Sequence, residues 1–189
     1  MDVLTCNMLF CVSVISHLKK TAGLFLLAFF VFTANIYAQA YKIYDDSAKR
    51  FKVSIPETWT YIPNYKETLF LAHRPLAYKG ESKIENVALS KIIDTSAGSM
   101  EDVYTSSILA SRFKDSTLLL TEQGTSPKAN YRWYISKHRN SKTNETIMSM
   151  TIVFYVKKQA YILQCTASAA TFAKYKNVFM KIADSLQFK

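Results

Sequence analysis

Apolar and polar residues alternate along much of the chain, a pattern typical of β-strands that have one face in a core. Phe51, Val53 and Ile55 alternate with polar residues, and Pro56 then ends this strand because proline cannot donate to the ladder. The same reasoning predicts further strands at residues 41–44, 68–72, 86–93, 118–121, 129–137, 145–156 and 160–167. Only hairpin-length connections separate the last three, so we expect an antiparallel meander there.

Two stretches between these strands carry the residues of loops and turns. The stretch 74–85 contains Pro75 and Gly80, and a second turn signal runs from Gly124 to Pro127. We therefore expect loops at 74–85 and at 122–129.

Two other segments have the spacing of amphipathic helices. The first opens at Ser99, carries Glu101 and Asp102 in its first turn, where the helix dipole favours acids, and runs to about Phe113. The second covers about residues 171–186 and places its apolar residues at spacings of three and four. An apolar helix face needs a sheet to lie on, so we expect one α+β domain with an antiparallel β-sheet packed between helices.

The first forty residues have the composition of a secretory signal peptide. Lys19 and Lys20 precede an apolar stretch, and small residues follow at Ala38 and Ala40. We therefore expect export, cleavage after Ala40, and a mature domain at residues 41–189 that is periplasmic or extracellular.

Three alternatives concern this segment. Residues 21–40 are about as long as a helix that spans a bilayer, so an uncleaved membrane anchor is one alternative. Met8 is an alternative start, which would give a more ordinary signal. Cys6 and Cys11 lack the small preceding residue that a lipoprotein signal prefers, so a lipid anchor is not expected.

Composition and charge narrow the class of protein. The chain has 189 residues and a formal net charge of +10. Its hydrophobic share of 49% excludes a disordered chain, which would lack the apolar surface to form a core. Removal of residues 1–40 takes away Lys19, Lys20 and Asp2, so the charge falls only to +9. It also leaves Cys165 as the one cysteine, so no internal disulfide is expected. The basic excess favours solubility and anionic neighbours.

No residue pattern in the sequence points to catalysis or to a bound cofactor. His73 and His138 share no metal-ligand spacing, and Cys165 lies on a predicted strand without adjacent cations. The sequence has no Gly-x-Ser-x-Gly elbow, and its isolated glycines form no phosphate loop. We therefore expect a protein that is not an enzyme and that binds no cofactor or metal.

The run from Tyr131 to Arg139 is rich in aromatic and basic residues. In a strand, alternate residues of this run face a core while the others meet solvent. Aromatic side chains beside cations can hold single-stranded nucleic acid, but export argues against such a partner, and we expect none. If this face binds anything, we expect an anionic envelope polymer, a lipid headgroup or an acidic protein. The candidate ligand residues are Arg132, Tyr134, Lys137 and Arg139.

Two stretches resemble one known family. The segment from Phe51 to Trp59, which reads F-x-V-x-I-P-x-x-W, resembles the opening of PsbP-like and DcrB-like domains, and residues 159–188 resemble their close. The resemblance covers about residues 48–188, and the tyrosine-alanine-glutamine end of the signal is similar to that of Bacteroidetes exports. It implies an α/β/α sandwich without a shared catalytic residue, in a family with photosystem subunits, bacterial envelope proteins and a Ran-binding protein. The core residues it implies are Phe51, Val53, Ile55, Pro56, Trp59, Tyr161, Leu163, Phe172, Tyr175, Phe179 and Ile182.

These expectations lead to three candidate functions. The first is an exported, non-catalytic binding or assembly module of the bacterial envelope, with an unidentified protein partner or anionic ligand. The second is an electrostatic binder of an anionic envelope polymer or lipid, suggested by the positive charge. The third is an envelope enzyme whose site lies in the loops at 74–85 or 122–129. Contact with the membrane is expected only through the signal segment, transiently or as an anchor if it is not cleaved.

Overall fold

The computed structural model describes residues 39–48, 50–79, 81, 85–92, 98–114, 119–126, 130–139 and 145–189. The part from Ala40 to Lys189 forms one compact unit. Residues 1–38, which hold nearly all of the expected signal segment, lie outside the described residues, so export and cleavage stay predictions. Within the described ranges, no helix is both long enough and apolar enough to cross a membrane.

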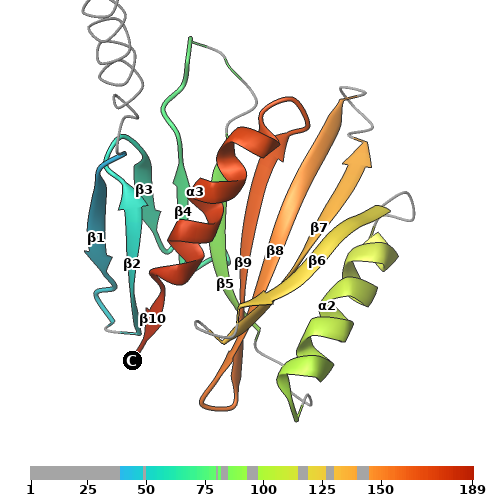
Figure 1. The fold of residues 1–189 in the computed structure, drawn as a ribbon. Coiled ribbons are helices and arrows are strands. Elements are labelled where there is room, and N and C mark those ends of the chain that lie inside the picture. The colour runs from blue at the N-terminus through green and yellow to red at the C-terminus, as the bar shows by residue number, and fades with distance from the viewer. Residues whose placement is uncertain are drawn as a thin grey trace, which may run out of the picture. The chain divides into compact units, whose positions relative to one another are not determined.

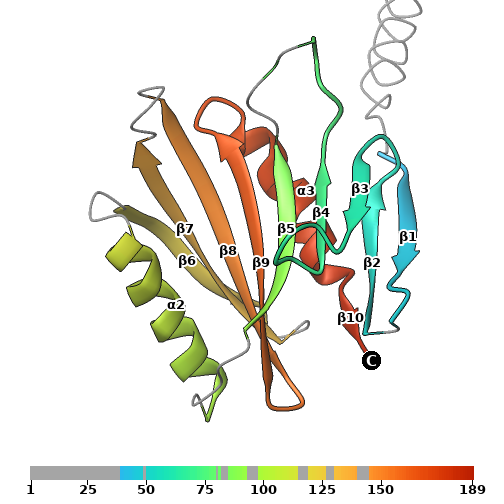
Figure 2. The same ribbon diagram turned by 180° about the vertical axis from the view of Figure 1, so that it is seen from behind.

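The described strands form two antiparallel sheets (Figures 1 and 2). The smaller sheet has the order β1-β2-β10, and the larger has the order β3-β4-β5-β9-β8-β7-β6. Neighbouring strands β7, β8 and β9 confirm the expected meander. The strands are β1 (Tyr41–Asp45), β2 (Phe51–Pro56), β3 (Thr60–Pro63), β4 (Phe70–His73), β5 (Asn86–Ile92), β6 (Leu119–Ser126), β7 (Tyr131–Arg139), β8 (Thr146–Val156), β9 (Gln159–Ser168) and β10 (Gln187–Phe188).

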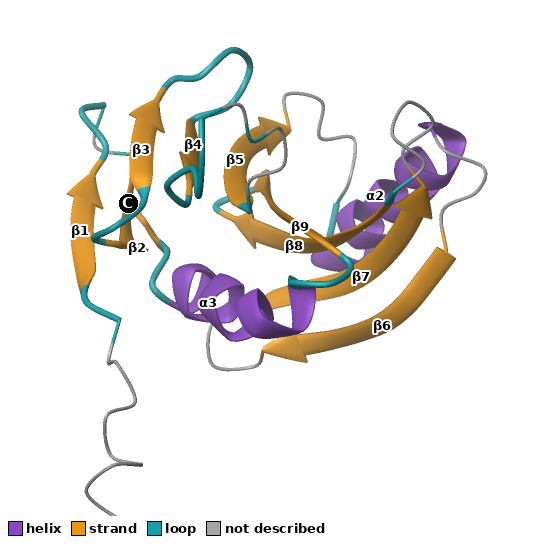
Figure 3. Cartoon of the chain, turned by 90° about the horizontal axis from the view of Figure 1, so that it is seen from above, coloured by secondary structure: helices purple, strands orange, loops and turns teal. Residues whose placement is uncertain are grey.

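The two described helices, α2 (Met100–Lys114) and α3 (Phe172–Asp184), lie apart from each other (Figure 3). They pack in two separate apolar clusters. Trp133 belongs to the cluster that contains α3, and its neighbour Tyr134 belongs to the cluster that contains α2. Adjacent residues of β7 separate in this way because successive side chains of a strand point to opposite faces. The part of the chain that the structure describes therefore has the expected α+β class, with mostly antiparallel sheet and two helices.

The larger cluster contains the core that the sequence pattern indicated. Phe51, Val53 and Ile55 of β2 are at most 1% exposed, as their alternation requires. On α3, Phe179 and Ile182 are fully buried, which explains the spacing of apolar residues along this helix. The other residues expected in the core are buried too, except Tyr175, which is partly buried and packs against the same cluster.

The structure corrects three local expectations. Strands β3 (Thr60–Pro63) and β10 (Gln187–Phe188) were not predicted, and α3 ends at Asp184, two residues before the expected end of the second helix. Gly124 was expected in a turn, but it lies inside β6, opposite Trp133 of β7. The glycine is needed there because the indole of Trp133 occupies the space of a side chain: a Cβ on Gly124 would stand 2.6 Å from Trp133 Cζ2.

Candidate functional site

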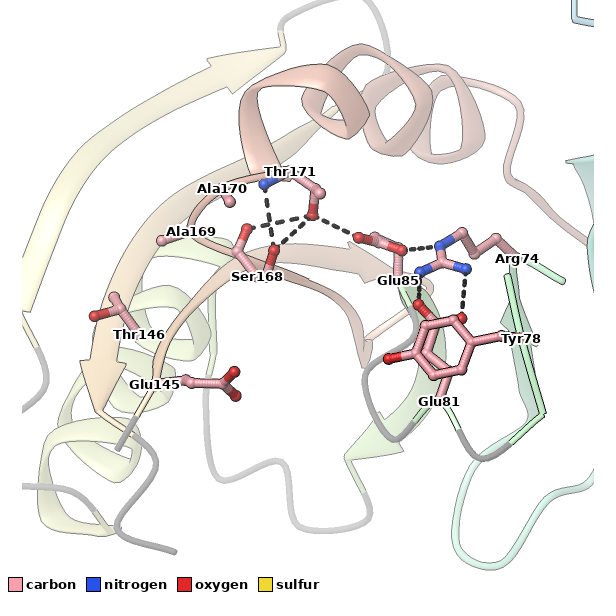
Figure 4. Close-up of a pocket in the computed structure, with 10 residues that line it drawn as sticks. All are labelled: Arg74, Tyr78, Glu81, Glu85, Glu145, Thr146, Ser168, Ala169, Ala170 and Thr171. Carbon is pink, nitrogen blue, oxygen red and sulfur yellow. Dashed lines mark hydrogen bonds and ion pairs between the residues drawn. The ribbon is translucent and has the colours of Figure 1, made fainter. Parts of the chain in front are cut away.

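A pocket of about 500 Å³ lies at one end of the larger sheet (Figure 4). Three parts of the fold meet there: the connection from β4 to β5, the start of β8, and the corner between β9 and α3. It is lined by Arg74, Tyr78, Glu81, Glu85, Glu145, Thr146, Ser168, Ala169, Ala170 and Thr171.

Arg74 is the central polar residue of the β4–β5 side. Its backbone N–H donates to the carbonyl of Glu85 at 3.1 Å, which continues the pairing of β4 with β5 by one residue. Its guanidinium holds the Glu81 carboxylate in a two-pronged ion pair, with Nη1 2.9 Å from Oε2, and its Nε donates to Glu85. The backbone N–H of Ala77 also donates to Glu81, at 2.6 Å. One arginine therefore fixes both carboxylates of the connection.

Glu85 joins this connection to a distant part of the chain. Its side chain is only 4% exposed, and it accepts a hydrogen bond from the hydroxyl of Thr171. The Thr171 hydroxyl lies 2.8 Å from Ser168 Oγ, and the Thr171 backbone N–H donates to that oxygen at 3.3 Å. Ser168 ends β9 and Thr171 precedes α3, so this network ties the two sides of the pocket together (Figure 4).

These contacts keep the two carboxylates ionised. The hydrogen bonds from the Arg74 guanidinium are the main reason that the pKa of Glu81 falls to about 2. Burial raises the pKa of Glu85, but the hydrogen bonds from Thr171 and Arg74 together outweigh this effect, so the pKa lies below its ordinary value. In turn, the hydrogen bonds to Glu81 raise the pKa of Arg74. Neither carboxylate is therefore poised to donate or accept a proton near neutral pH.

The remaining lining residues leave the pocket open and acidic. Tyr78 is 67% exposed, so its ring is available to an incoming molecule. Glu145 adds a third carboxylate, and with one arginine the lining has a formal excess of negative charge on a chain whose net charge is +10. The pocket can therefore hold polar groups by hydrogen bonds and can stack a flat group on Tyr78.

The structure does not bring the four candidate ligand residues of the sequence analysis onto one open face. Tyr134 is 1% exposed and donates to the carbonyl of Ser107 in α2 at 3.2 Å. Arg132 lies 4.1 Å above the ring of Tyr104 and pairs with Glu101 of the same helix.

The other two candidate ligand residues, Lys137 and Arg139, are exposed. They follow Tyr134 on β7 by three and five positions, so their side chains point to the face of the sheet opposite that of Tyr134. Helix α2 thus covers the side on which solvent was expected.

The other residues considered for chemistry have structural surroundings. Cys165 is fully buried, and burial raises the pKa of its thiol. His73 Nδ1 lies 2.8 Å from the carbonyl of Arg74, and His138 is half-buried on β7. In the described part of the chain, no three or more His, Cys, Asp or Glu side chains are grouped as a metal site.

The sequence pointed to one wall of the pocket without identifying its residues. The loop at 74–85, named as a place for an enzyme site, supplies Arg74, Glu81 and Glu85. Of the other named loop, residues 122–126 are part of β6, and residues 127–129 lie outside the described residues. An arginine followed by two glutamates in one loop was the available signal, but Thr171, which donates to Glu85, is far away in sequence.

No protein-family model matches the sequence, and no curated protein matches it. Solved structures do match its fold. A cyanobacterial PsbP (CyanoP) from Synechocystis sp. PCC 6803 has 11% identity and a TM-score of 0.51, over 82% of this chain and 96% of its own. LpqN, involved in cell envelope biogenesis of Mycobacterium tuberculosis, has 10% identity and a TM-score of 0.50, over 79% and 91%. A point mutant of Mog1 has 7% identity and a TM-score of 0.60, over 79% and 96%.

Proposed function

We propose that this chain, which has the PsbP-like fold, is an exported, non-catalytic binding or assembly module of the bacterial envelope. In this proposal the pocket at the β9–α3 corner receives a part of the partner or ligand. The support comes from the signal-like first forty residues, from the fold, and from the chemistry of the pocket. The described role of LpqN in cell envelope biogenesis is compatible with this assignment, although that role belongs to LpqN.

The network of Arg74, Glu81, Glu85 and Thr171 is the observation on which the proposal rests. An enzyme that uses carboxylates for acid–base work keeps at least one of them near the operating pH. Here the pKa of Glu81 is lowered to about 2, and Glu85 is engaged by Arg74 and Thr171. Such a network gives a pocket firm walls instead of a reactive group, which suits binding.

The finer architecture belongs to the same proposal. We infer that the domain is the α/β/α sandwich expected from the resemblance, with α2 and α3 on different faces of the larger sheet. The separation of Trp133 and Tyr134 into two clusters, each with its own helix, supports this arrangement.

Site-specific photo-crosslinking in the producing bacterium tests the proposed function. A photoreactive residue replaces Tyr78 at the pocket, and the matched control carries it at Ile43 on β1, which is equally exposed at 68% against 67%. We expect one discrete envelope adduct with the Tyr78 variant and none with the Ile43 variant. Equal adducts at both positions, or none at either, would contradict a binding role for the pocket.

The enzyme alternative has a separate readout. The third lining carboxylate, Glu145, is the group to replace, with Glu145→Gln. Turnover of an envelope component by the wild-type protein that this variant abolishes would favour an enzyme over a binding module. We expect no such turnover.

A further inference from the structure

The turn that joins β8 to β9 has an unusual composition. Val156 pairs with Gln159, so only Lys157 and Lys158 form the loop of this hairpin. Both lysines have a left-handed backbone, with φ angles of 52° and 58°. A two-residue hairpin that requires positive φ at both positions strongly favours asparagine followed by glycine, because other residues are strained there.

Five described residues other than glycine have a left-handed backbone, and only at this turn are two of them adjacent lysines. Asn64 and Asn130 are of the residue type that tolerates this conformation best after glycine, and Lys66 is a single lysine. At the hairpin tip the chain has two lysines instead. Strained backbone that persists where a better residue is available points to a role for the side chains. The feature that the lysines add is a pair of adjacent ammonium groups.

The described surroundings of the turn supply no ion-pair partner for these charges. Both lysines are exposed, and neither forms an ion pair with any described residue. Lys91 of β5 is also exposed. It lies opposite Tyr161 in the β5–β9 ladder, and Tyr161 is three residues, or about 10 Å, along β9 from Lys158.

The carboxylates near this end have partners of their own. Asp45 pairs with Lys52 and Lys189, Asp46 with Arg50, and Glu101 with Arg132. Asp184 accepts a hydrogen bond from the hydroxyl of Tyr131. The ring centre of Phe188, next to Lys189, lies 4.3 Å from that of Tyr161, which places Lys189 and its partner Asp45 near the base of the hairpin. Among the described residues, Lys157, Lys158 and Lys91 therefore form a basic surface, which we call the lysine tip.

We propose that the lysine tip is a contact site for an anionic phospholipid surface. The hairpin projects past the ends of the neighbouring strands in Figures 1 and 2, so it meets a plane more readily than it encloses a molecule. A lysine ammonium is a compact point charge without the fixed fork of arginine, which suits a fluid array of phosphate headgroups. The pocket lies at the other end of β8, about 35 Å away along its 11 residues, so this proposal does not depend on it.

Vesicle co-sedimentation of the compact unit 40–189 tests this proposal. The vesicles are phosphatidylcholine with and without phosphatidylglycerol, at low salt. The main variant is Lys157→Asn with Lys158→Gly, which removes both charges and gives the turn its preferred residues, so it melts higher than the wild type and cannot lose binding by unfolding. The matched control, Lys174→Gln with Lys181→Gln, removes the same charge from exposed positions of α3.

We expect binding to the anionic vesicles alone, weakening as salt rises. The turn variant loses about 30-fold in partitioning, the equivalent of about 2 kcal/mol, while the α3 variant loses much less. Lys157→Gln with Lys158→Gln, which keeps the strained turn, loses as much as the turn variant. Equal losses in the turn and α3 variants would overturn the proposal in favour of net charge. Binding to soluble polyphosphate without binding to vesicles would overturn it in favour of a polymer.

Discussion

Trp133 lies directly opposite Gly124 across β7 and β6, and its indole fills the space where a side chain of residue 124 would be. Trp133 is 9% exposed, and the ammonium of Lys176 from α3 lies over its ring, 5.2 Å from the ring centre. Lys176 also donates to Glu122 of β6 at 2.6 Å. The glycine thus lets an aromatic ring link the edge strand β6 to α3.

Gly124→Ala is expected to destabilise the domain by about 1–3 kcal/mol, because the added methyl group overlaps the indole and forces it to move. The built Cβ would lie 2.6 Å from Trp133 Cζ2. Urea denaturation followed by tryptophan fluorescence measures the change. Gly98→Ala is the matched control, since its Cβ meets nothing closer than Asp102 Oδ2 at 3.9 Å. Equal stability of the two variants would show that β6 and β7 are spaced differently.

Arg74→Met is expected to cost about 3–5 kcal/mol near pH 7, because it leaves the buried carboxylate of Glu85 without its cation. Arg74 and Glu85 side chains are 17% and 4% exposed, so solvent screens their interaction little. Thermal and chemical denaturation give the change. The control Lys52→Met breaks a pair with Asp45 whose side chains are 45% and 49% exposed, and it is expected to lower stability far less than Arg74→Met does.

A second variant distinguishes the charge of Arg74 from its packing. Adding Glu85→Gln to Arg74→Met removes the stranded charge, so part of the lost stability should return. If the double variant is less stable than Arg74→Met, the arginine contributes through packing and not through its charge.

Acid is expected to destabilise the domain within a defined window. The pKa of Glu81 falls from 4.5 to about 2 on folding, chiefly through its hydrogen bonds with Arg74, and the pKa of Asp46 is lowered by hydrogen bonds from Arg50. A lowered pKa stabilises the folded state above the unfolded pKa, and this contribution disappears as pH falls through the folded pKa. Stability contributed by these groups is therefore constant above about pH 5 and declines toward pH 2.

Urea midpoints measured from neutral pH down to about pH 2 check this window. Glu81→Gln removes one of the two groups, so its stability should decline less steeply in the same range. An identical decline in the wild type and the variant would contradict the assigned ion pair.

Phe179→Ala is expected to cost about 3–5 kcal/mol, because it empties the centre of the larger cluster. The ring is fully buried and meets Trp59 edge-on at 6.5 Å. Differential scanning calorimetry gives the shift in melting temperature. Ile43→Ala, at a position that is 68% exposed, is the control and should melt within the error of the wild type.

The sequence could predict the elements whose pattern depends on local spacing. The alternation of Phe51, Val53 and Ile55 and the spacing along α3 reflect burial on one face, which any partner surface satisfies. Strand β3 escaped prediction because its four residues end in Pro63 and none of them is fully buried, so no alternation marks it. Gly124 was misplaced because the reason for it is the indole of Trp133 on another strand.

The candidate site shows the same limit more strongly. Alternation along β7 separates Tyr134 from Trp133, but it cannot say that α2 covers the side of Tyr134. Arg74 and Glu85 belong to one loop, whereas Thr171 comes 86 residues after Glu85 and meets it only in the folded chain. Contacts between residues this distant are set by topology, which local patterns do not contain.

The burial of Cys165 has a practical consequence. It lies on β9 between β5 and β8, with its side chain fully buried, and it is the one cysteine past residue 40. A thiol reagent can reach it only when these central strands part, so its labelling rate at low denaturant reports the free energy of that opening. The domain thus contains its own reporter of unfolding, which needs no engineered residue and lies in neither the pocket nor the lysine tip.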